Sequence, residues 1–121
     1  MIPESFDLLG HTIKVKLIKK LLDRGVNVGE SNDPENTITI SNKYKDGDKV
    51  KTANDDYIEH TFYHELVHQI LTKMGEYKLN NNEKFVDNFA ALLYQFEKSK
   101  KFKWIIVPRN IKFILWFYID N

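Results

Sequence analysis

Residues 64 to 68, H-E-L-V-H, place two histidines four positions apart with a glutamate next to the first. In a helix, residues four apart lie one turn apart on one face, so His64 and His68 can reach a single metal ion. Glu65 lies about 100° further round the helix, where it can hold a water molecule without being a ligand. Zinc acidifies such a water, and the glutamate accepts its proton. The competing interpretation is a chance match on a helix that binds no metal.

A catalytic zinc needs a third protein ligand besides the two histidines. The chain has four histidines, none of them after His68, and no cysteine. A ligand further along the chain must therefore be a carboxylate. Glu76 follows too closely, beyond the expected end of the helix, whereas Glu83 and Asp87 lie one turn apart near the start of the next expected helix. These last two remain the candidates for the third ligand.

The first third of the chain has the patterns of β-strands. Residues 11–18 alternate apolar and polar side chains, the period of a half-buried strand. Two shorter stretches, near 26–31 and 36–41, flank residues 32–36, whose Asn, Asp and Pro favour a turn. We therefore expect a strand and a hairpin in a small antiparallel sheet. Residues 42–53 are polar and are expected to form a loop.

Two helices are expected after this loop, which makes the fold α+β. The first runs from a cap at Asp56 to Gly75 and includes the H-E-x-x-H pattern. The second begins after Asn82 and contains both carboxylate candidates. Small alanines at 90 and 91 would let it approach the first helix. Its apolar face consists of Phe85, Phe89, Leu92, Leu93 and Phe96.

From residue 83 the chain continues E-K-F-V-D-N-F-A, and at this point it resembles a known family. The E-x-x-x-D element is similar to that of gluzincins, the thermolysin-like zinc peptidases. A nearer likeness is to small ImmA/IrrE-type and phage-encoded metallopeptidases. These combine a strand and hairpin, an H-E-x-x-H helix and a second helix with E-x-x-x-[ND]-x-F-A. The resemblance covers roughly residues 11–97 and implies a zincin-like metallopeptidase domain over residues 1–101.

The resemblance also implies a role for each site residue. It implies that His64, His68 and Glu83 bind zinc, that Glu65 is the general base and that Asp87 orients a ligand histidine. The role of Asp87 has a separate reason, because ligating imidazoles usually donate their other N–H to a carboxylate.

The expected function is that of a zinc-dependent endopeptidase acting on a protein or peptide. In such peptidases an edge strand holds the substrate extended, and residues 37–41 are the expected strand. The residue that stabilises the oxyanion is not assigned, and Tyr57, Tyr63, Tyr94 and His60 are the candidates. An alternative is a catalytically inactive zinc-binding interaction module. A third hypothesis is a regulatory peptidase that cleaves one cognate partner.

Composition excludes several other classes. A net charge of +1, with only two arginines, gives no case for direct nucleic-acid binding. The absence of cysteine excludes disulfides, thiolate zinc fingers and iron–sulfur clusters. We expect no secretory signal, because residues 1–5 contain neither a basic region nor an apolar run. We also expect no membrane span, because the most apolar stretch, 111–119, is far below the roughly 20 residues required. The apolar tail, 102–121, is expected to pack on the same domain or to serve association. Abundant Lys and Asn suggest a bacterial or phage source, and the absence of a disulfide framework fits the cytoplasm.

Overall fold

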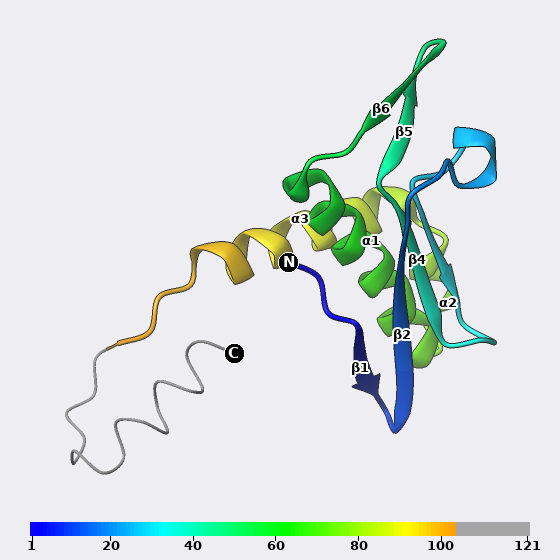
Figure 1. Cartoon of the computed structure of the whole chain (residues 1–121). Coiled ribbons are helices and arrows are strands. Elements are labelled where there is room, and N and C mark those ends of the chain that lie inside the picture. Colours follow the sequence, from blue (N-terminus) through cyan, green and yellow to red (C-terminus); the bar gives the residue numbers. More distant parts are fainter. Residues whose placement is uncertain (104–121) are drawn as a thin grey trace.

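The helix α1 (Asp55–Lys73) contacts both a β-sheet and a second long helix, α3 (Glu83–Ser99). In the computed structural model, which describes residues 1–103, Phe62 of α1 packs on buried isoleucines of the sheet, whereas Val67 and Leu71 pack on α3. Figure 1 shows α1 between these two partners. The predicted α+β class is confirmed, and the helix with the H-E-x-x-H pattern lies at the centre of the molecule.

The main sheet has four strands in the order β1-β2-β4-β3: β1 (Ser5–Leu8), β2 (His11–Ile18), β3 (Gly29–Asn32) and β4 (Thr37–Ser41). The predicted hairpin is present as β3 and β4. The prediction of an antiparallel sheet is wrong, because β2 and β4 run parallel and the sheet is mixed. Ile38 and Ile40 make β4 apolar, so it occupies the interior, while the polar strand β3 lies at the edge.

A second hairpin consists of β5 (Lys43–Asp46) and β6 (Lys49–Thr52). The prediction of a loop over residues 42–53 is therefore wrong. Gly47, with φ +64°, forms its turn. Figure 1 shows this hairpin projecting away from the main sheet. Because neither of its faces is buried, its sequence lacks the apolar alternation that reveals a half-buried strand.

The helix ends follow local capping rules, with one correction. Asn54, and not Asp56, caps α1 by accepting a hydrogen bond from the backbone N–H of Tyr57. Gly75 follows the helix with φ +74°, as expected. Asn82 caps α3, which also confirms the sequence prediction. Short turns complete the fold: η1 (Asp23–Gly25) before β3, and α2 (Tyr77–Asn80) between the long helices.

The two faces of α3 differ from the prediction. Val86, Ala90 and Tyr94 are buried against α1, so the expected close approach at Ala90 is confirmed. By contrast, much of the predicted apolar face is exposed to solvent, notably Leu92 and Phe96. Nearly all of the predicted tail, from residue 104 on, lies outside the described residues. Among residues 1–103, no helix has the length and apolarity needed to cross a membrane.

Candidate metal centre

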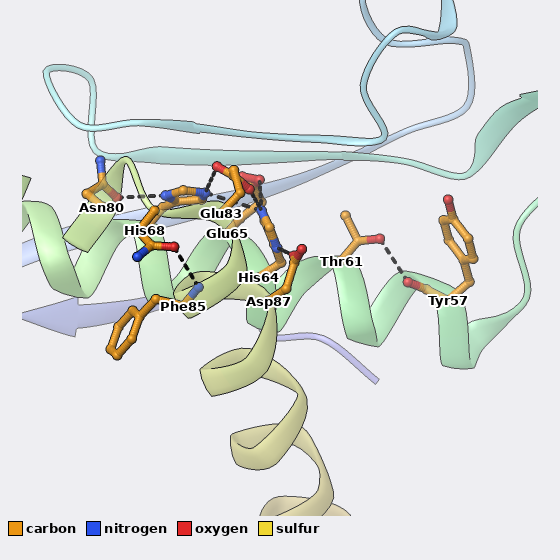
Figure 2. A network of polar contacts seen from close by, with 10 residues as sticks. Tyr57, Thr61, His64, Glu65, His68, Asn80, Glu83, Phe85 and Asp87 are labelled. Atoms are coloured by element: carbon orange, nitrogen blue, oxygen red, sulfur yellow. Dashed lines mark hydrogen bonds and ion pairs between the residues drawn. The ribbon is translucent and has the colours of Figure 1, made fainter. Parts of the chain in front are cut away.

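His64, His68 and Glu83 form a compact group of possible ligands, with one donor atom of each within 4.8 Å of the others. The two Nε2 atoms are 3.2 Å apart. The Glu83 carboxylate faces both, with Oε2 3.4 Å from Nε2 of His64 and Oε1 3.3 Å from Nε2 of His68. Figure 2 shows these side chains pointing toward one another. Two imidazoles and one carboxylate are a donor set that suits a metal ion, which this group could hold.

Each histidine has a hydrogen-bond partner on its other ring nitrogen. Nδ1 of His64 lies 2.8 Å from Oδ1 of Asp87, and Nδ1 of His68 lies 2.6 Å from Oδ1 of Asn80. A carboxylate and an amide oxygen can only accept, so both Nδ1 atoms donate when the rings are neutral. In this tautomer of each imidazole the proton is on Nδ1, and the Nε2 lone pair faces Glu83. Metal binding through Nε2 needs this tautomer.

Three helices place these groups. His64 and His68 lie one turn apart on α1, and Glu83 is the first residue of α3. Asp87 follows one turn later and reaches the other side of the His64 ring. Asn80 ends the short helix α2, which connects the two long helices. The positions of the Glu83 and Asp87 carboxylates therefore depend on how α3 packs on α1.

Glu65 lies beside this group in a different environment. Its side chain is only 8% exposed, and Oε1 is 4.0 Å from Nε2 of His64. Burial raises the pKa of the Glu65 carboxyl from 4.5 to about 7, while positive charge on His68 opposes the rise. A buried carboxylate whose pKa is near neutrality is suited to accept and return a proton.

Two hollows meet at this carboxylate and form a groove. They have volumes of about 560 and 620 Å³, and both are lined by Asn27, Gly29, His64 and Glu65. The second hollow follows the edge strand β3 as far as Pro34. The prediction that residues 37–41 form the edge is wrong, since β4 lies between β2 and β3. The strand that borders the groove is β3.

The remaining candidates divide into those that line the groove and those that do not. Tyr57 and His60 line the first hollow. Tyr94 is buried, and its single O–H proton is shared between the carboxylates of Asp56 and Glu59. Tyr63 packs in the core. Glu76 is exposed and outside the group of possible ligands.

Sequence reasoning missed Asn80 and Gly29. The run Asn80-Asn81-Asn82 indicates a helix cap, and only Asn82 has that role. Gly29 lies so close to the site that only glycine fits there. A Cβ at this position would lie 2.6 Å from Cγ2 of Thr61 and 3.0 Å from Cγ of Glu65. No local pattern in the sequence signals either contact.

Comparison with protein-family models, curated proteins and solved structures finds no match to this chain.

Proposed function

We propose that this protein is a zinc-dependent endopeptidase with a zincin-like fold. The observation on which the proposal rests is the buried Glu65 carboxylate beside the group formed by His64, His68 and Glu83. The order of elements supports it, because a sheet precedes the H-E-x-x-H helix and a second helix supplies the third donor. The likeness of residues 11–97 to small ImmA/IrrE-type peptidases points the same way.

Zinc is the metal that best fits these donors. Two neutral imidazoles and one carboxylate, with no thiolate in the chain, are a donor set of hydrolytic zinc sites. Asp87 and Asn80 hold the two rings by their Nδ1 atoms, which keeps both Nε2 atoms available. Such second partners are a usual feature of functional metal sites.

Bound zinc supplies Lewis acidity toward a water molecule and a substrate carbonyl. Glu65 accepts the proton from the attacking water, since its carboxylate lies beside the ligand group and its pKa is raised to about 7. The protonated Glu65 then donates to the amine of the cleaved peptide bond, which restores the carboxylate. Burial under Gly29 and Thr61 limits the movement of this side chain.

The groove fits an extended peptide. Among residues 1–103, strand β3 pairs only with β4, so its other edge is available for main-chain hydrogen bonds. The hollows extend to both sides of Glu65, which allows the chain to continue in either direction from the cleaved bond. This supports cleavage within a peptide rather than only at its end.

The test replaces Glu65 with Gln, which keeps the shape of the side chain and removes the base. We expect one bound zinc per chain in both proteins and a loss of peptide cleavage of about 10²- to 10⁴-fold in the variant. Metal content is measured by elemental analysis, and cleavage by mass spectrometry on a peptide library. His64→Ala is the control for metal loss.

Glu76→Gln is the matched control for the base, because it removes a carboxylate that is exposed and outside the ligand group. It should cleave like the unaltered protein. Zinc binding without cleavage of any library peptide by the unaltered protein would instead identify a zinc-binding module. Equal cleavage by Glu65→Gln would contradict the proposed mechanism.

A further inference from the structure

One face of α3 forms an apolar seam, most of which is exposed to solvent in the described part of the chain. Phe85, Phe89, Leu92 and Phe96 follow one another at intervals of four, three and four residues. This spacing is that of the contact positions of a helix packed on another apolar segment. Phe89, Leu92 and Phe96 are 48%, 68% and 59% exposed.

Apart from Phe85, which packs partly against the core, the seam is separate from the face that packs on α1. That face consists of Val86, Ala90 and Tyr94, which are buried. The seam also includes a hollow of about 300 Å³ between Phe85, Phe89 and Leu92. The Phe85 and Phe89 rings are stacked, with centroids 5.7 Å apart. The seam is thus a second apolar surface on α3, with aromatic side chains and a hollow. Such a surface indicates that it binds a partner other than α1.

We propose that residues 111–119 of the same chain cover this seam. These residues contain eight apolar side chains and one lysine. Burying them against the apolar seam removes both surfaces from water, which is favourable. They follow α3 closely, and residues 104–111 can span up to about 26 Å. The seam from Phe96 back to Phe89 is only about 10 Å long along the helix, so the tail can reach it.

The tail is a better occupant than a second copy or a membrane. Attachment to α3 gives the tail a local concentration on the order of millimolar at the seam of every molecule. Pairing of two copies through α3 would cover the seams but leave both tails exposed. A bilayer span requires about 20 apolar residues, more than the tail provides.

Tryptophan fluorescence tests the proposal directly. Of the two tryptophans in the chain, Trp116 lies in the segment proposed to cover the seam, and a Trp104→Phe background leaves it as the single probe. In this background we expect monomers by light scattering, emission typical of shielded tryptophan and weak quenching by acrylamide. Leu92→Glu places a charge in the seam, and should shift the emission to the red and increase the quenching constant severalfold.

Gln95→Glu is the matched control, because it adds the same charge to an exposed position of α3 outside the seam. It should leave emission and quenching unchanged, and retained helical circular dichroism with cooperative urea unfolding shows that both variants are folded. Unchanged quenching in Leu92→Glu would overturn the proposal. It would also be overturned if Trp116 is shielded only in a dimer that dissociates on dilution, or only when anionic phospholipid vesicles are added.

Discussion

Oδ1 of Asp87 lies 2.8 Å from Nδ1 of His64, whereas Glu83 faces Nε2 of the same ring. Two acids one turn apart on α3 thus reach opposite sides of one imidazole. The Asp87 carboxylate accepts the Nδ1–H and so fixes the tautomer, and the Nε2 lone pair is left for a metal. The two acids that the sequence left as alternative ligands therefore have different positions at the site.

Asp87→Ala should weaken zinc binding by about 10- to 100-fold, because the His64 ring loses the group that orients it. The measurement is a competition titration against a zinc chelator. Glu97→Ala is the control, since it removes a carboxylate from the same helix away from the group. An unchanged zinc affinity in Asp87→Ala would show that His64 does not need this partner.

Asn80→Ala should have an effect of the same order on zinc affinity. Oδ1 of Asn80 is 2.6 Å from Nδ1 of His68, and no other hydrogen bond to that nitrogen is present in residues 1–103. Asn80→Asp keeps an acceptor at this position and should retain tight binding. Asn81→Ala, at the neighbouring exposed position, is the control. If Asn80→Ala and Asn81→Ala bind zinc equally well, the hydrogen bond has no role in the site.

Gly29→Ala should destabilise the protein by about 1–3 kcal/mol and reduce cleavage, because the new methyl group collides with Thr61 and Glu65. Cγ2 of Thr61 is the nearest atom, at 2.6 Å. Thr61→Ser removes that atom and keeps the hydroxyl that donates to the Tyr57 carbonyl. The double variant should recover most of the stability, measured by urea unfolding. No recovery would mean that another contact limits the space.

Glu59 should make the free energy of unfolding depend on pH below about pH 4.5. A hydrogen bond from the α-ammonium group of Met1, with others from Lys98 and Tyr94, lowers its pKa from 4.5 to about 2. A lowered pKa means that the folded state favours the carboxylate. The stabilisation is therefore complete above pH 4.5 and is lost as the pH falls toward 2.

Glu59→Gln removes this charge and should cost about 1–3 kcal/mol at pH 7. The difference in unfolding free energy between the two proteins should shrink between pH 4.5 and 2. Both are measured by urea unfolding with a chelator present, so that metal release does not contribute. A difference that stays constant over this range would show that Glu59 is not ionised more readily in the folded state.

Several features of this protein follow from local patterns in its sequence. The spacing of His64 and His68 placed both on one helical face, and Asn82 and Gly75 marked helix ends through backbone hydrogen bonds and positive φ. Alternation in residues 11–18 identified β2. These features arise within a few residues, so a short stretch of sequence contains their cause.

Which distant groups meet depends on the packing of the whole domain. The parallel pairing of β2 with β4, the edge position of β3 and the contact of Asn80 with His68 join segments that no local pattern relates. The same holds for the different positions of Glu83 and Asp87, which depend on the angle at which α3 packs on α1. Such contacts result from burying apolar surface across the whole domain, and that free energy is non-directional and belongs to no single segment of the sequence.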